Sequence, residues 1–183
     1  MTTGGLRAAY FGAGQAILAS EGYGGLKLAA VVGRLGVTTG SFYHSFASWQ
    51  EYTDALLENW REERTTQLVA LARGHAHPVE RLRVLARMSA DLPHRSEAAI
   101  RVWAAVEPRV RAVQERVDDD RRAIVVEALE ELVGPEDAAH PAVLAMCTLV
   151  GYEMLADRVS PEELAWSLDA ILRSAVDGRG RDG

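Results

Sequence analysis

Apolar residues along this chain recur at intervals of three and four positions, which is the period of an amphipathic helix. The alternation of apolar and polar positions that marks a half-buried strand is not found. Glycine and proline separate the helix-like stretches. The pattern therefore predicts an all-α fold of about nine helices. Their expected positions are about 6–20, 28–35, 39–46, 49–73, 79–92, a short helix from Ser96, 108–133, 141–157 and 161–177.

Residue types at the ends of these stretches support the assignment. Gly22 can take the positive φ that often ends a helix. Pro108 suits the first position of a helix, and the run from Ser160 to Glu163 is a strong helix start. Gly134-Pro135 is expected to end the seventh helix.

The segment from Leu28 to Phe46 has the pattern of two short helices joined by a tight turn. Gly36 supplies a residue free to adopt positive φ between the two helices, and Thr38 is a favourable N-cap for the second one. Phe42 and Phe46 stand four positions apart, so one face of this second helix is expected to be anchored in the core. The pattern predicts a helix-turn-helix, although a helical hairpin in another kind of α protein would give the same spacing.

The opposite face of the second helix carries small or hydrogen-bonding groups and no acidic residue. Hydroxyl and imidazole groups on such a face can reach phosphates or base edges in the major groove of DNA. The residues on this face are Thr39, Gly40, Tyr43 and His44.

These residues resemble the motif of the tetracycline-repressor (TetR) family. The resemblance rests on Gly22-Tyr23, on the turn Leu35-Gly36-Val37 and on the run from Thr39 to Phe46. It covers about residues 6–57, and beyond them only the number and order of the helices match. It implies a DNA-binding domain over residues 1–47 and a helical ligand-binding and dimerisation domain over residues 48–178. Residues 179–183 are expected to form a disordered tail.

By position in the family's motif, the resemblance implies DNA contacts from one exposed face of the module. Tyr43 resembles a phosphate-binding tyrosine, and Lys27 at the start of the first short helix would face the DNA backbone, where helix amides also favour phosphate. The family often has lysine where this chain has Thr39 and Trp49, so fewer cations predict modest affinity. The implied DNA-binding residues are Lys27, Thr38, Thr39, Gly40, Ser41, Tyr43 and His44.

The charge distribution agrees with DNA contact at one end of the chain. The net charge of the whole chain is −6. Residues 1–49 contain three basic residues against Glu21 alone, a balance of +2, which leaves 17 basic and 25 acidic residues, a balance of −8, for the remainder. A mildly basic N-terminal segment followed by an acidic remainder is typical of a protein that binds DNA through its N-terminal segment.

The C-terminal half is expected to form a homodimer. The stretch 142–156 is apolar nearly all round, so it must be buried on more than one side. Two such helices from each copy would form a four-helix interface, the arrangement that the family resemblance implies, although both could instead complete a monomer core. The expected interface residues are Leu149, Tyr152, Leu164, Leu168 and Ile171.

The middle of the chain is expected to hold a small effector, because the resemblance implies a cavity among these helices. Large aromatic and methionine side chains there would suit a hydrophobic or aromatic ligand, although such stripes are more often plain core. The expected ligand-binding residues are Trp60, Met88, Leu92, Trp103 and Val113.

Other groups favour structural interpretations, and the sequence predicts neither a metal nor a cofactor. Asp118-Asp119-Asp120 fan around a helix and cannot converge on one ion, so pairing such as Asp118 with Arg122 is expected. His75 and His77 lie in a polar loop. Cys147 is expected to be buried, because it lies in an apolar run. Glu153 is expected to pair with an arginine across the dimer interface, or else to recognise a cationic effector.

The sequence as a whole predicts a dimeric, sequence-specific DNA-binding regulator that reads a palindromic operator in double-stranded DNA. A repressor released by a small hydrophobic effector is favoured. The alternative is a helical small-molecule-binding or interaction protein whose DNA binding is weak or lost. An enzyme is not expected, because no catalytic grouping or phosphate loop is found. The N-terminus lacks a secretion signal and no apolar run reaches about 18 residues, so a cytoplasmic protein without membrane contact is predicted.

Overall fold

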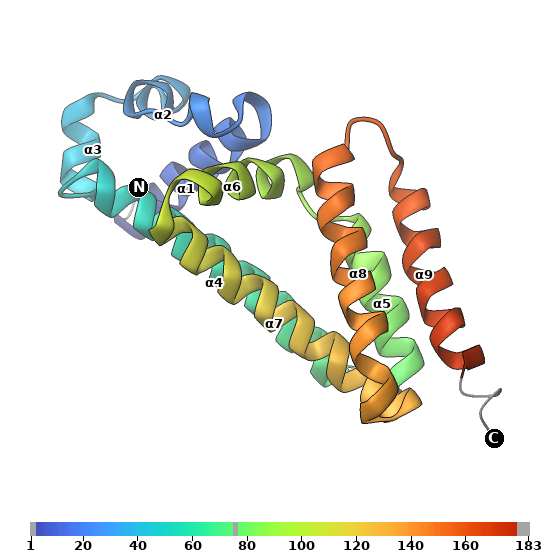
Figure 1. Ribbon diagram of the computed structural model, residues 1–183. Coiled ribbons are helices and arrows are strands. Elements are labelled where there is room, and N and C mark those ends of the chain that lie inside the picture. The colour runs from blue at the N-terminus through green and yellow to red at the C-terminus, as the bar shows by residue number, and fades with distance from the viewer. Residues whose placement is uncertain (1–2, 75–76, 179–183) are drawn as a thin grey trace. The chain divides into compact units, whose positions relative to one another are not determined.

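The computed structural model describes residues 3–74 and 77–178, and this part of the chain is entirely helical apart from its turns. It contains nine α-helices and one short 3-10 helix, Tyr23–Gly25 (Figure 1), which confirms the predicted fold class. The α-helices are α1 (Thr3–Glu21), α2 (Leu28–Leu35), α3 (Thr39–Ser45), α4 (Trp49–Gly74), α5 (Pro78–Ala90), α6 (His94–Val106), α7 (Pro108–Val133), α8 (Pro135–Leu155) and α9 (Pro161–Gly178).

Most of the predicted helix ends are confirmed. Gly22 and Gly36 have positive φ values of 69° and 65°. Pro108 opens α7. At the start of α9, the amide of Glu163 donates to Ser160 Oγ over 3.3 Å, and the Glu163 carboxylate accepts from the Ser160 amide over 2.8 Å, which is a reciprocal capping box.

Two predicted helix starts are wrong, for reasons that concern proline. α8 begins at Pro135 rather than at Pro141, because a residue without an N–H is well suited to the first turn of a helix. Pro141 then lies inside α8, where it cannot donate a hydrogen bond to the preceding turn. α6 begins at His94, and the Ser96 hydroxyl donates to the carbonyl of Pro93 over 2.9 Å instead of capping the helix.

The chain divides into two compact units whose boundaries differ from the predicted one at residue 47. The first unit comprises the described residues up to Glu63 together with Pro93–Gln114, and the second comprises Arg64–Leu92 and the described residues from Glu115 onward. The first part of α4, α6 and the start of α7 therefore fold with the N-terminal helices. Both α4 and α7 contribute residues to each unit.

An aromatic cluster from α1, α3 and α4 forms part of the core of the first unit. The rings of Tyr10, Phe42, Phe46 and Tyr52 are buried, and their centroids lie 5.1–5.6 Å apart in the edge-on or tilted contacts that aromatic quadrupoles favour. The Tyr52 hydroxyl donates to the carbonyl of Tyr10 over 2.9 Å, so its polar end is satisfied within the core. Burial raises the pKa of the Tyr52 hydroxyl well above its ordinary value.

Gly14 allows α4 to approach α1 closely beside this cluster. A Cβ atom at position 14 would overlap the Tyr52 hydroxyl and lie 2.9 Å from Leu56 Cδ2. Gly12, two residues earlier on α1, has open space where its Cβ would be. Gly12 and Gly14 therefore differ: packing requires a glycine at position 14 but not at position 12.

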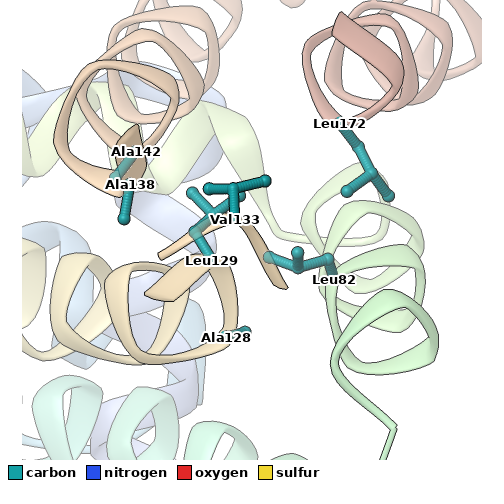
Figure 2. Close-up of a cluster of buried hydrophobic side chains, with 7 residues drawn as sticks. All are labelled: Leu82, Ala128, Leu129, Val133, Ala138, Ala142 and Leu172. Atoms are coloured by element: carbon teal, nitrogen blue, oxygen red, sulfur yellow. The ribbon is translucent and has the colours of Figure 1, made fainter. Parts of the chain in front are cut away.

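The second unit has an apolar core to which α5, α7, α8 and α9 all contribute. Figure 2 shows Leu82 of α5 pointing toward Leu129 and Val133 of α7, with Leu172 of α9 and the alanines of α8 in the same cluster. Arg81 of α5 is buried next to this core and donates to Glu131 of α7 over 2.8 Å. The buried residues of the cluster are Leu82, Ala128, Leu129, Val133, Ala138, Ala142 and Leu172.

We expect alanine substitutions of the two glycines to change stability in opposite directions. Gly12→Ala should raise the free energy of unfolding by about 0.5–1 kcal/mol, because alanine favours the helix and meets no neighbour. Gly14→Ala should lower it by about 1–3 kcal/mol, because the methyl group displaces Tyr52 and Leu56. Urea unfolding followed by circular dichroism measures both values. Equal effects of the two substitutions would contradict the close approach of α4 at Gly14.

Candidate functional site

The helix-turn-helix predicted from Leu28 to Phe46 is formed by α2 and α3. Gly36 joins the two helices in the left-handed conformation, with φ 65° and ψ 30°, and the amide of Val37 donates to the carbonyl of Val32 over 3.1 Å. Thr38 Oγ1 accepts a hydrogen bond from the amide of Ser41 over 3.2 Å, which confirms its expected role as N-cap. The turn therefore fixes the direction in which α3 leaves α2.

The two faces of α3 have the expected polarity. Phe42 and Phe46 are buried in the aromatic cluster. Tyr43 is 51% exposed although it is large and partly apolar. The other exposed residues of this face are Thr39, Gly40 and His44. A helix anchored by two phenylalanines thus presents hydroxyl, imidazole and phenol groups to solvent.

The remaining predicted DNA-binding residues differ in exposure. Lys27 is exposed at the N-cap of α2, where no side chain caps the helix amides. Thr38 is exposed as well. Ser41 is only half-exposed, and its Oγ accepts a hydrogen bond from the Tyr10 hydroxyl over 3.4 Å. Ser41 therefore belongs in part to the packing between α1 and α3.

Arg7 and Trp49 stabilise the module from within. The Arg7 guanidinium donates to the carbonyl of Ser45 over 2.6 Å and lies 4.2 Å from the centre of the Phe46 ring. Trp49 packs against Phe42 and Tyr52. Because α1 begins at Thr3, Arg7 lies on this helix and joins α1 to the end of α3.

Two of the predicted ligand-binding residues have other roles in the first unit. Trp60 is fully buried, and its Nε1 donates to the buried carboxylate of Glu97 over 2.7 Å. Trp103 stacks on Tyr23 with ring centroids 5.1 Å apart, and its Nε1 donates to Glu107 over 2.6 Å. Both indoles have polar partners inside the packed structure, as buried tryptophans usually do.

The second unit contains a cavity of about 110 Å³ with an apolar lining. α5, α7, α8 and α9 contribute most of its wall, and the buried side chains of Leu82, Leu129 and Leu172 in Figure 2 form part of it. Met88 and Leu92, both predicted ligand-binding residues, line this cavity. Trp60, Trp103 and Val113 belong to the first unit and are not part of the lining.

Charged groups also line the cavity. Arg121 is one of them, and its position near the phase of the apolar stripe of α7 suggests a polar contact in the pocket or in an interface. Arg64 and Arg121 are 7% and 6% exposed. Arg83 and Asp169 complete the charged part of the lining. Arg64 is not distinguished in the sequence from the many other arginines, so only the three-dimensional structure could reveal its burial.

The predicted dimer residues mostly face inward. Leu149, Tyr152 and Leu164 form a buried cluster within the chain, and Leu168 packs against it. Ile171 lines the cavity. The burial of Tyr152 and the nearby carboxylates of Glu162 and Glu163 raise the pKa of its hydroxyl. These residues pack inside the second unit, and different residues of α8 form its outward face.

That outward face of α8 is an exposed apolar stripe. Its residues recur at helical spacing. They include Cys147, which is exposed, whereas the sequence predicted that it would be buried. Trp166 of α9 is 68% exposed. The stripe on α8 comprises Val143, Leu144, Cys147, Gly151, Met154 and Leu155.

α8 is also long and apolar enough to cross a membrane, judged by length and composition alone. The mean hydropathy of an 18-residue window within its 21 residues is 1.3, and 28% of that window is buried inside the chain. The buried Glu153 lies on this helix, and its carboxylate is 3.6 Å from the Arg121 guanidinium of the same chain. Glu153 thus pairs within the chain, whereas the sequence suggested an arginine across an interface.

Asp118 pairs with Arg121 over 3.7 Å, whereas the sequence suggested Arg122 as its partner. Among residues 3–74 and 77–178, no three histidine, cysteine or acidic side chains are placed to hold a metal ion. His75 and the tail 179–183 lie outside the described residues.

Several solved transcriptional regulators have a similar fold. A regulator from Rhodococcus sp. Rha1 is 23% identical, with a TM-score of 0.80, and the match covers 94% of this chain and 96% of that one. A regulator from Saccharomonospora viridis in complex with choline is 14% identical, with a TM-score of 0.81 and coverage of 93% and 96%. A TetR-family regulator from Agrobacterium tumefaciens is 18% identical, with a TM-score of 0.77 and coverage of 97% and 98%.

No family model matches the sequence, and no curated protein is similar to it. The structural matches nevertheless cover almost the whole chain. They show that the chain shares the helical fold of these transcriptional regulators. More specifically, the chain has the fold of the TetR family, as the motif between Gly22 and Phe46 suggested.

We expect Glu107 to make the stability of the first unit depend on pH. The Arg109 guanidinium, with the Trp103 N–H, holds the pKa of Glu107 below its ordinary value. A lowered pKa means that the interaction stabilises the fold above the unfolded-state value of about 4.3 and is lost as pH falls through the folded-state value.

Glu107→Gln should therefore lower the free energy of unfolding by about 1 kcal/mol at neutral pH, and by less as the pH falls below about 4. Glu130→Gln, at an exposed position of α7, is the control and should have little effect at any pH. Denaturant unfolding at several pH values measures the difference. A pH-independent effect of Glu107→Gln would contradict the role of its charge.

Proposed function

We propose that this protein is a dimeric, sequence-specific DNA-binding transcriptional regulator in the cytoplasm, and that it represses until a small hydrophobic effector releases it. The observation that carries the proposal is α3 itself. One face of the helix is anchored by Phe42 and Phe46, and the other leaves Thr39, Tyr43 and His44 exposed. Such a helix can enter the major groove with its polar face toward the bases.

The start of α2 supports contact with the DNA backbone. Its first amides have no side-chain cap, and Lys27 is exposed at the same point. Free amides at a helix N-terminus favour phosphate, and a lysine adds a point charge. Since Arg7 is occupied inside the module, the cations that remain exposed in α1–α3 are Lys27 and Arg34. We therefore expect a shallow dependence of the affinity on salt.

The exposed stripe of α8 and Trp166 of α9 form the surface that we assign to the homodimer. A stripe of large apolar side chains at helical spacing marks an interaction surface. A second copy of the chain is the natural partner, because a palindromic operator requires two modules related by two-fold symmetry. Gly151 in the middle of the stripe has no neighbour within 4 Å of its Cβ position, so another helix can approach closely there.

The cavity of the second unit is the site that we assign to the effector. Arg64 of α4 lines it, and α4 continues without interruption from the end of the DNA-reading module. An effector that binds one conformation better than another shifts the population toward it. We infer that α4 transmits this shift to the spacing of the two α3 helices in the dimer.

We expect substitutions on the exposed face to weaken DNA binding in two distinct ways. Tyr43→Ala should weaken binding to the DNA upstream of the protein's own gene by about tenfold or more, because a hydrogen bond to a charged phosphate is lost. Lys27→Gln should weaken binding to all sequences alike and reduce the slope of log affinity against log salt by about 0.9. Fluorescence anisotropy at several salt concentrations measures both.

Two controls accompany these variants. Val106→Ala removes an exposed apolar side chain on α6, and Arg158→Gln removes an exposed cation after α8; neither should change DNA affinity. Unchanged binding by Tyr43→Ala would show that α3 does not read DNA. If the unaltered protein fails to bind even at low salt, the module is a scaffold and the protein is better described as a helical small-molecule-binding protein.

We expect Gly151→Glu to separate the dimer without unfolding the chain. The side chain has open space in the single chain, but it would place a charge in the middle of the proposed interface. Analytical ultracentrifugation should give twice the chain mass of 19.9 kDa for the unaltered protein and the chain mass for the variant. Circular dichroism should give the same helix content for both.

Ala123→Glu introduces the same charge at an exposed position of α7 and should remain dimeric. A Gly151→Glu protein that stays dimeric would exclude the α8 stripe as the interface. An unaltered protein that is monomeric at all concentrations would exclude the dimer.

A further inference from the structure

The helix α3 lacks every side chain that makes paired hydrogen bonds with a base. Arginine and lysine identify guanine in the major groove in this way, asparagine and glutamine identify adenine, and aspartate and glutamate accept from cytosine. None of these residue types occurs between Thr39 and Ser45. If α3 enters the groove, as the proposed function requires, it must read the bases by another kind of contact.

Most polar groups of α3 are engaged elsewhere or carry little information about the base. Ser41 Oγ accepts a hydrogen bond from α1 over 3.4 Å. Tyr43 is assigned to a phosphate, and phosphate contacts position a protein without reading the sequence. His44 can donate to N7 of a purine, which guanine and adenine both present. The exposed residues that are left are Thr39 and Gly40, the first two of α3.

Gly40 lies within a helix although the fold does not require a glycine there. An added Cβ atom at this position would lie 3.7 Å from Thr38 Oγ1, which is an ordinary van der Waals distance. A glycine in a helix is less stable than an alanine, and one use of glycine is to let another molecule approach the backbone. A close approach of DNA to the first turn of α3 gives Gly40 a physical reason.

We propose that α3 identifies thymine by its C5-methyl group, which packs against the γ-methyl group of Thr39 beside the backbone of Gly40. Thymine is the base that presents a methyl group in the major groove, and the methyl group of a threonine makes apolar contact with it. The N-terminal residues of a recognition helix are those that reach base edges. This inference rests on the proposed function, because it requires α3 to enter the DNA.

Replacement of thymine by uracil tests the proposal, because the two bases differ only in this methyl group. Duplexes that bind the unaltered full-length protein are first enriched from a random pool. Each symmetric pair of thymines in the enriched site is then replaced by deoxyuridine, and fluorescence anisotropy measures the affinity. At one pair the replacement should weaken binding by about fourfold for each half-site, as expected for one buried methyl group. An enriched site at which no replacement lowers the affinity would overturn the proposal.

Two variants of Thr39 separate the role of its methyl group from that of its hydroxyl. Thr39→Ser keeps the hydroxyl and removes the methyl group, so it should bind the thymine and uracil duplexes equally. Thr39→Val keeps a methyl group and removes the hydroxyl, so it should still prefer thymine by about fourfold for each half-site. A preference that survives in Thr39→Ser, or that disappears in both variants, would exclude the methyl group of Thr39 as the contact.

Gly40→Ala should change stability and DNA binding in opposite directions. Alanine favours the helix, so the midpoint of thermal unfolding should rise by a few degrees. The DNA affinity should fall by about tenfold, because the Cβ atom holds the bases away from α3. Gly12→Ala is the matched control: this exposed position of α1 has open space, so the midpoint should rise and the DNA affinity should not change. A Gly40→Ala protein with unaltered DNA affinity would contradict the close approach that the proposal requires.

Failure of the proposed function and failure of this inference give different results. A protein that enriches no duplex from the random pool does not read DNA, and both fail. A protein that enriches a defined site but binds thymine and uracil alike reads DNA through another contact, so the inference alone fails. A loss of affinity with uracil that Thr39→Ser abolishes supports both.

Discussion

The burial of the aromatic cluster around Phe42 and Phe46 is the interaction on which the DNA-reading module depends. These rings fix the rotation of α3 about its own axis, because the pair lies one helical turn apart and must face Tyr10 and Tyr52. The polar face of α3 is exposed as a direct consequence. The Arg7 guanidinium and the Trp49 ring then hold the end of α3 and the start of α4 against the same cluster. Orientation of the polar residues is thus a product of apolar packing.

The helix-turn-helix could be predicted from the sequence because its features depend on local chemistry. Gly36 needs positive φ, Thr38 needs a helix to cap, and two phenylalanines four positions apart need a core; each requirement depends on residues within one or two turns. For the same reason most helix ends could be predicted. Pro135 and Pro141 misled the prediction because proline is compatible with both the end of one helix and the first turn of the next.

Packing between segments that are distant in the sequence could not be predicted in the same way. α8 is apolar on nearly every side, so its sequence does not show which face turns inward. Tyr152, which was expected at a dimer interface, is buried within the single chain, and Cys147 is exposed. Trp60 and Trp103 illustrate a related limit. Their size suggested a ligand pocket, but their N–H groups meet Glu97 and Glu107, carboxylates that no spacing rule connects to them. Arg121 could be singled out from the sequence because it lies near the phase of the apolar stripe of α7, whereas no local pattern marks Arg64 as buried.

The distribution of tryptophan has a consequence for observing this molecule in solution. Trp49, Trp60 and Trp103 all belong to the first unit, and the exposed Trp166 belongs to the second. Indole emission shifts with the polarity of its surroundings, so the buried and exposed rings emit at different wavelengths, and water-soluble quenchers reach the exposed one first. The protein therefore contains a natural fluorescent label for each unit, and changes in the two can be followed separately without attaching a dye.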